Sequence, residues 1–295
     1  MWQAEFVKRQ LESAHPGIEV ELLGLTTQGD RWLGAPLSEV GGKGLFVKEL
    51  EQAMLDGRAD AAVHSMKDLP AFVDDAFVLP AIGFRADVRD VVVSRGGARL
   101  DALPARANVG SSSLRRSAQM LAVRPDLVVS PVRGNVETRL KKLDNGDYDA
   151  LVLAAAGLDR LGLGHRITER LPLEVSLPAA GQGALGVECL AVAKEVMALL
   201  GKLDDPVVSR CVTAERAVSR ALGADCSLPI AAHARLVDDR YEVKALLASP
   251  DGKRVLRSTA SDVDPERAGS EAARRLLDAG GVDILAGLAH ASRPH

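Results

Sequence analysis

The sequence predicts an α/β protein with two similar domains around a cleft, followed by a small α+β domain with a three-stranded antiparallel sheet. A helix that stops at a glycine and leads into a short apolar strand occurs twice, at residues 45–63 and 136–154. Such a repeat indicates two like domains that face one cleft, although a chance match of loop chemistry is the alternative. After residue 206 the pattern changes to three short strands joined by turn residues, which is typical of an antiparallel sheet.

Length and composition are those of an ordinary globular protein. The 295 residues suffice for two or three domains, and 47% hydrophobic with 26% charged residues are usual proportions. The net charge of −3 and the aromatic content of 3% argue against a nucleic-acid binder. The sequence has no secretory signal pattern and no apolar run near about 18 residues, and its three cysteines form no CxxC pair. We therefore expect a cytoplasmic protein with no membrane partner.

The first predicted domain begins on a helix. Residues 1–14 have an amphipathic pattern that His15-Pro16-Gly17 ends, and residues 18–23 alternate as a strand. A polar, Gly-rich loop precedes a second helix at 45–55, and the buried strand 61–63 follows. Because a doubly wound domain normally starts on its central strand, we expect a further strand upstream of Met1.

The strand at 61–63 ends in a polar tip that carries Lys67 and Asp68, and Pro70 blocks further ladder pairing. In open α/β sheets, ligands bind outside the carboxyl ends of the strands, so this pair lies where chemistry is usually placed. Taken alone, the tip is better interpreted as a turn whose aspartate bonds its own backbone. The neighbouring His64 is expected to pack or to orient backbone.

The second predicted domain contains a candidate anion site. A strand at 91–94 and a second one ending at 109–110 precede the serine run 111–113, and a helix follows at 114–123. Hydroxyls and free N–H groups at a helix N-terminus, with Arg115 and Arg116 in its first turn, favour an anion. The alternative is a plain capped helix with solvated arginines.

The remaining elements complete three domains. Residues 176–188 are small and apolar and are predicted to return the chain to the first domain. We expect domain 1 at 1–83 and 184–203, domain 2 at 84–183 and domain 3 at 204–295. The elements predicted in domain 3 are a helix at 207–222, strands at 230–236, 241–247 and 254–258, a helix at 265–279 and a short tail.

Three features could carry chemistry: the acid Asp68, a set of basic residues at strand ends and helix starts, and Cys226 in a Gly-containing loop. The basic residues are Lys43, Lys67, Arg115, Arg116, Arg133, Arg139 and Arg160. Clustered arginines imply a ligand with several carboxylates or phosphates. One carboxylate among cations stays ionised and can stabilise a developing positive charge or move a proton. Cys226 alone is more often a small buried side chain, and the sequence contains neither a zinc cluster nor a P-loop.

Several stretches, taken together and in order, resemble the porphobilinogen deaminase family along essentially the whole chain. They are Val40 to Leu50, Val63-His64-Ser65-Met66-Lys67-Asp68, Gly110 to Arg116, Arg133-Gly134-Asn135, Leu177-Pro178-Ala179-Ala180-Gly181-Gln182-Gly183 and the Cys226 loop. The resemblance implies two domains like those of type 2 periplasmic binding proteins, plus a third that carries the cysteine. It also implies a dipyrromethane cofactor that Cys226 holds through a thioether.

The resemblance further implies the role of each site residue. Asp68 corresponds to the family's catalytic aspartate. Carboxylates of the cofactor are assigned to Lys43, Lys67, Arg115 and Arg116, with hydroxyl contacts from Ser111 and Ser113, and those of the substrate to Arg133, Arg139 and Arg160. No metal is implied.

The activity implied is that of a hydroxymethylbilane synthase. Four porphobilinogen molecules are joined head to tail with loss of ammonia, and Asp68 stabilises the cation formed as ammonia leaves. We expect a monomer with porphobilinogen as its small-molecule partner.

The start of the chain departs from the family pattern. Family members usually open with a strand and loop bearing an Arg-x-Ser motif, and this sequence begins just after it, at Trp2-Gln3-Ala4. We expect the true start to lie upstream. The alternatives are a non-catalytic binding module for an anionic ligand and an inactive, N-terminally truncated deaminase.

Overall fold

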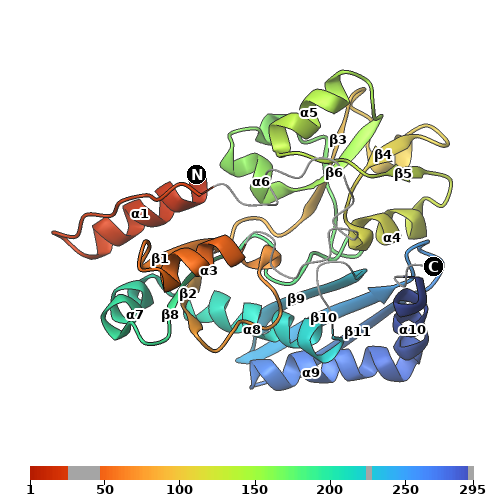
Figure 1. Ribbon diagram of the computed structural model, residues 1–295. Helices are drawn as coiled ribbons and strands as arrows, with labels where there is room; N and C mark the ends of the chain where they lie inside the picture. The colour runs from red at the N-terminus through yellow and green to blue at the C-terminus, as the bar shows by residue number, and fades with distance from the viewer. Residues whose placement is uncertain (26–46, 224–227, 292–295) are drawn as a thin grey trace.

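The computed structural model describes residues 1–25, 47–223 and 228–291, and these form three sheets with helices around them (Figure 1). The strand orders are β1-β8-β2, β5-β4-β6-β3-β7 and β11-β10-β9. The mixed α/β class and the three-stranded antiparallel sheet of the C-terminal part, both predicted from the sequence, are confirmed.

The first sheet is antiparallel throughout, with β8 in its centre. Its strands are β1 (Ala61–Ser65), β2 (Phe77–Gly83) and β8 (Leu185–Leu190), and the helices around it are α1 (Trp2–Ala14), α3 (Lys48–Leu55) and α7 (Lys194–Leu200). As expected for a segment that returns the chain, residues 176–188 lead back into the first sheet, where β8 pairs with β1 and β2.

The second sheet combines parallel and antiparallel pairing. Its strands are β3 (Asp90–Ser94), β4 (Asn108–Gly110), β5 (Val128–Ser130), β6 (Ala150–Ala154) and β7 (Glu169–Arg170), and its helices are α4 (Leu114–Val123), α5 (Val136–Asp144) and α6 (Ala155–Arg160). Successive residues of β3 and β6 enter different cores: Val92 packs with Met120 of α4, whereas Val91 packs with Leu140 of α5. Burial on both faces explains why these two strands are nearly continuous apolar runs.

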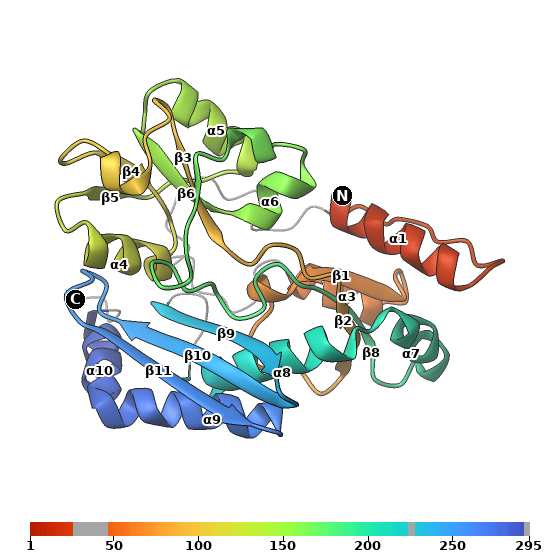
Figure 2. The same cartoon turned by 180° about the vertical axis from the view of Figure 1, so that it is seen from behind.

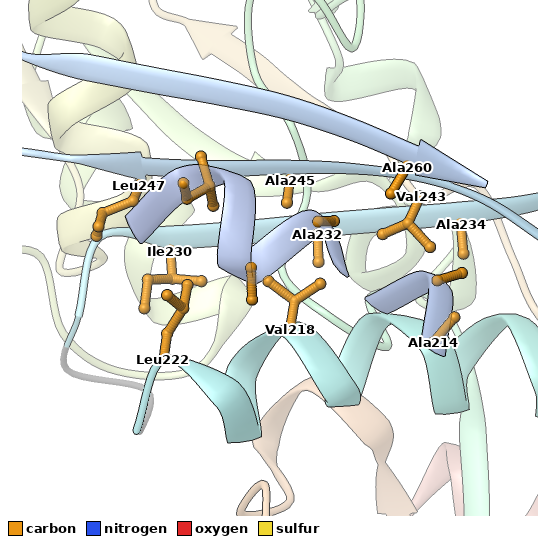
Figure 3. Packing of buried hydrophobic residues seen from close by; sticks show 14 of the residues in the cluster. Ala214, Val218, Leu222, Ile230, Ala232, Ala234, Val243, Ala245, Leu247 and Ala260 are labelled. Atoms are coloured by element: carbon orange, nitrogen blue, oxygen red, sulfur yellow. The ribbon is translucent and has the colours of Figure 1, made fainter. Parts of the chain in front are cut away.

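In the third sheet, the helices lie against one face (Figure 2). The strands are β9 (Ile230–Val237), β10 (Arg240–Ala248) and β11 (Val255–Asp262), and the helices are α8 (Pro206–Ala221), α9 (Pro265–Leu276) and α10 (Val282–Ala291). Figure 3 shows Ala214, Val218 and Leu222 of α8 directed at this sheet. Helices α8 and α9 approach so closely that a Cβ at Gly269 would lie 2.1 Å from the Ala214 carbonyl oxygen. Only glycine fits at that crossing.

The repeat is confirmed at its helix ends. Helix α3 closes with Gly57 N–H on Met54 O and Arg58 N–H on Ala53 O, and α5 closes with the same pair of bonds from Gly146 and Asp147. Both glycines have positive φ, 68° and 88°, as this helix stop requires. The surrounding pairing differs, because β6 has the parallel neighbour β4 whereas β1 pairs antiparallel with β8.

Two expectations about secondary structure are wrong. Residues 18–23 form no strand: the Val20 backbone is bonded by side chains of α1, with its carbonyl on Lys8 Nζ (2.5 Å) and its N–H on Glu12 Oε1 (3.2 Å). The predicted tail after residue 279 is the helix α10. Gly280, at φ 98°, turns the chain between α9 and α10.

The two crossings between the first and second sheets lie side by side, joined by a bond from Ala86 N–H to Gly183 O (3.0 Å). We propose that the domain boundaries follow the sheets, as the sequence predicts: 1–83 with 184–203, 84–183 and 204–295. The adjacent crossings, which enter the second sheet after β2 and leave it before β8, support this division.

Candidate active site

Asp68 lies at the end of a short 3-10 turn, η1 (Met66–Asp68), that follows β1 directly. Met66 is the anchor of the turn: its side chain is buried and its N–H bonds Ala184 O at 3.1 Å. Gly181 and Gly186 leave room for it, since a Cβ at either position would lie 2.7 Å or less from a Met66 side-chain atom. Asp68 itself is exposed, and its carboxylate makes no hydrogen bond or ion pair to another residue of the described ranges. The tip is thus a turn, as the simpler interpretation held, but the Asp68 carboxylate does not bond its own backbone.

The charge of Asp68 acts on cations from three elements, η1, α4 and α5. Burial lowers the pKa of Lys67, and the Asp68 charge opposes that shift. In Arg139 of α5, burial and the charge of Arg116 lower the guanidinium pKa, again opposed by Asp68. Lys67, Arg116 and Arg139 therefore lie within electrostatic reach of one carboxylate, although Lys67 and Arg139 are 72 positions apart in the sequence.

A second carboxylate, Asp90, organises the arginines of α4, and sequence reasoning missed it. Asp90 is fully buried at the start of β3. Its Oδ2 accepts from Arg115 Nη1 (2.6 Å) and Ser176 Oγ (2.7 Å), and its Oδ1 accepts from Arg116 Nε (2.9 Å) and Gln182 Nε2 (3.0 Å). Burial alone would raise the pKa of Asp90, but the two arginines hold it well below its usual range. A charged residue heading a buried apolar strand was the available signal, because such a charge requires partners.

The Asp90 contacts change how the predicted anion site is interpreted. Both terminal nitrogens of Arg115 are engaged: Nη1 also donates to Leu177 O (2.6 Å), and Nη2 contacts Asp90 Oδ1 (3.2 Å) and Gln182 Oε1 (3.4 Å). Arg116 contacts Asp90 through both Nε (2.9 Å) and Nη2 (2.8 Å), and Val152 O through Nη1 at 3.4 Å, so one N–H on each terminal nitrogen remains for a ligand. Both side chains are buried, so the alternative of solvated arginines is wrong.

In the serine run 111–113, one serine has a structural role and the other two remain candidate ligand contacts. Ser112, not a predicted site residue, bonds both Val132 O (2.7 Å) and Val132 N–H (3.0 Å), which ties the loop before α4 to the loop before α5. Ser111 is buried, and its oxygen accepts from Ser113 N–H at 3.3 Å. Ser113 occupies the N-cap position of α4 as expected, but its hydroxyl makes no cap bond.

The other predicted cations lie in different surroundings. Arg133 is half-buried and makes no hydrogen bond or ion pair within the described parts of the chain. Arg139 Nε donates to Gly134 O (2.7 Å). Arg160 donates to Gly183 O at a domain crossing (2.6 Å) and stacks over the Trp2 ring, 5.6 Å from its centroid. Lys43 and Cys226 lie outside the described residues.

His64 pairs with a carboxylate behind the site. Its Nε2 lies 3.0 Å from Glu188 Oε2 across β1 and β8, and both side chains are buried. This agrees with the expectation that His64 packs. In the described ranges, no His/Cys/Asp/Glu group is arranged to hold a metal, and no helix is long and apolar enough to cross a membrane.

Known protein families and proteins match this chain over nearly its whole length. Residues 1–198 match the family model "Porphobilinogen deaminase, dipyromethane cofactor binding domain", and residues 209–278 match "Porphobilinogen deaminase, C-terminal domain". Proteins named porphobilinogen deaminase are 52% identical in Thiobacillus denitrificans (97% of this chain, 94% of the relative) and 54% identical in Bordetella parapertussis (98% and 92%).

Among solved structures, the substrate-binding protein of an amino acid ABC transporter is similar with a TM-score of 0.37 and 16% identity, over 68% of this chain and 78% of that one. The family models and the relatives at about half identity cover all three sheets. This chain belongs to the porphobilinogen deaminase family.

Proposed function

We propose that this chain is a hydroxymethylbilane synthase, a transferase of tetrapyrrole biosynthesis, in which Asp68 is the catalytic residue. The observation that carries the proposal is the exposed Asp68 carboxylate, whose charge acts on the pKa values of Lys67, Arg116 and Arg139. An exposed carboxylate is accessible to a ligand that approaches this turn. The family match, which covers all three sheets, supports the same activity.

Asp68 has two tasks in this proposal. As porphobilinogen loses ammonia, positive charge develops on the pyrrole, and a fixed carboxylate stabilises that charge. The proton that leaves after the new carbon–carbon bond forms is taken up through the same group. No described side chain occupies the Asp68 oxygens, so they are available for pyrrole N–H groups.

The residues present fit a dipyrromethane, whose side chains are carboxylates. Lys67 and the remaining donors of Arg116 are the primary contacts, with Ser111, Ser113 and Lys43 as further ligands, and Arg115 acts mainly by fixing Asp90. When bound, the group supplies the pyrrole carbon to which the first substrate unit is joined. We propose that Cys226 attaches it through a thioether.

The arginines outside α4 are proposed to hold the carboxylates of incoming porphobilinogen. Arg133 has no internal partner in the described ranges, and Arg139 spends only Nε on backbone. Arg160 bonds Gly183 at the domain crossing, where a change in domain angle moves it. A site that accepts four successive units must shift chain or domains between steps, and paired crossings permit this.

The proposed setting of the enzyme is the cytoplasm, as a monomer that binds porphobilinogen and neither nucleic acid nor membrane. An odd number of cysteines without a CxxC pair suits a reducing compartment, and the net charge of −3 does not favour nucleic acid.

The turnover assay separates this function from the alternatives. The purified protein is incubated with porphobilinogen, and ammonia and linear tetrapyrrole are measured. We expect four porphobilinogen consumed and four ammonia released per tetrapyrrole. Saturable porphobilinogen binding without ammonia release would instead identify a non-catalytic binding module. Turnover only after restoring an upstream strand would identify the chain as a truncated deaminase.

A further inference from the structure

Helix α8 presents one side to the catalytic turn and another to the third sheet. Val208 and Val212, one turn apart, lie in the core cluster that contains Met66 and Leu69, and Arg216 follows one turn later. Ala214, Val218 and Leu222 instead pack in the core of the third sheet. Figures 1 and 2 show α8 running between the first and third sheets. The helix therefore connects the segment that carries Asp68 to the C-terminal domain.

Arg216 continues the row of Val208 and Val212 on the side of α8 that faces this turn, and it is the polar residue of that row. It is 6% exposed, and it donates to three successive carbonyls: Leu69 O (3.3 Å), Pro70 O (2.6 Å) and Ala71 O (3.1 Å). These residues follow Asp68 directly and belong to no helix or strand. A planar guanidinium with fixed donors suits such converging carbonyls, and a lysine cannot reproduce that geometry.

The segment after Asp68 lacks the usual means of fixing backbone. Residues 69–71 form no ladder with a neighbouring strand, and Pro70 has no N–H to donate. Met66 anchors the turn on the N-terminal side of Asp68 through its bond to Ala184, and Arg216 anchors it on the C-terminal side. Asp68 therefore lies between two anchors, one of which comes from the C-terminal domain.

We propose that Arg216 is a positioning residue for catalysis, which holds Asp68 at a fixed distance from the domain that carries the cofactor. The proposal rests on the proposed function, because it acts through Asp68. Loss of the three carbonyl bonds frees the C-terminal side of η1 while both cores that α8 joins stay apolar and packed. A displacement of about 1 Å at a reacting group costs on the order of 10²-fold in rate.

The test compares Arg216→Gln and Arg216→Lys with Arg220→Gln in the cofactor-loaded enzyme. Arg220 lies one turn further along α8 and pairs with the exposed Glu266, so it controls for a lost arginine on this helix. We expect Arg216→Gln to lower kcat by about 10- to 100-fold with KM changed less than about threefold. Arg216→Lys should recover part of that loss, and Arg220→Gln should match the parent protein.

Two readouts distinguish positioning from general destabilisation. In the Asp68→Asn background, Arg216→Gln should add little further loss, since two residues that act as a unit are not additive. Hydrogen exchange of a peptide spanning residues 61–72 should be faster in Arg216→Gln, whereas peptides of the third sheet should be unchanged. This second readout needs no turnover, so it still tests the anchoring if the proposed function is wrong.

Three results would overturn the proposal: an equal loss of kcat in Arg220→Gln, fully additive losses with Asp68→Asn, or unchanged exchange at 61–72. If Arg216→Gln does not fold, Arg216→Lys carries the same tests, with kcat lowered less than about tenfold.

Discussion

Replacing Asp68 with asparagine is expected to lower kcat by about 10²- to 10⁴-fold, the range of a lost proton-transfer or charge-stabilising group. Asparagine keeps the shape of the side chain but removes the negative charge that acts on Lys67, Arg116 and Arg139. The exposed position makes the change structurally mild, so the protein should fold and should retain its covalent adduct. Turnover is measured by ammonia release, and the adduct by intact mass.

The matched control for this substitution is Asp75→Asn. Asp75 is an exposed aspartate seven positions further on, with no hydrogen bond or ion pair to another described residue. Its replacement should leave kcat unchanged. Near-normal turnover in Asp68→Asn would refute the role given to Asp68.

Replacing Asp90 with alanine is expected to lower the free energy of unfolding by about 3–5 kcal/mol, the cost of leaving buried charge without its partner. Arg115 and Arg116 would both lose their carboxylate partner while their side chains remain largely buried. The folded-state pKa of Asp90 is depressed, so its contribution is present above the unfolded-state pKa of about 4 and is lost only as the pH falls through the depressed value. Urea unfolding at neutral pH measures the loss.

Asp87→Ala is the control for Asp90. Asp87 also pairs with two arginines, Arg89 and Arg170, but those side chains are 43% and 30% exposed. Exposed ion pairs contribute about 0–1 kcal/mol, so this variant should unfold close to the parent. Equal destabilisation by the two variants would contradict the claim that burial gives Asp90 its importance.

The sequence predicted most of the fold because its signals are local. The helix at 114–123 matches α4 at both ends, and the glycine stops before β1 and β6 are set by the need for positive φ. The same local signals gave a wrong prediction at residues 18–23, which form no strand. Their alternation is real, with Val20 half-buried, but strand formation depends on a neighbouring strand, and the Val20 backbone bonds Lys8 and Glu12 instead.

The sequence predicted which residue types form the candidate site, but not which residues those side chains contact. The sequence indicated Arg115 and Arg116 as a pair of ligand-binding cations, whereas in the fold they share the buried Asp90. No residue within ten positions of α4 indicates this partner, because Asp90 lies 25 positions before Arg115. The role of Arg216 could not be predicted for the same reason, because its partners are backbone carbonyls about 146 positions away. The roles of Lys43 and Cys226 rest on family resemblance alone.

The central claim is that this chain carries its own pyrrole cofactor on Cys226 and extends it beside Asp68. The measurement that tests it most directly is the intact mass of the purified protein after supply of porphobilinogen, with Cys226→Ser as the control. We predict an added mass equal to two linked pyrroles, a pink Ehrlich reaction, and loss of both in Cys226→Ser. An unmodified mass in the parent protein, or an adduct that persists in Cys226→Ser, would contradict the account.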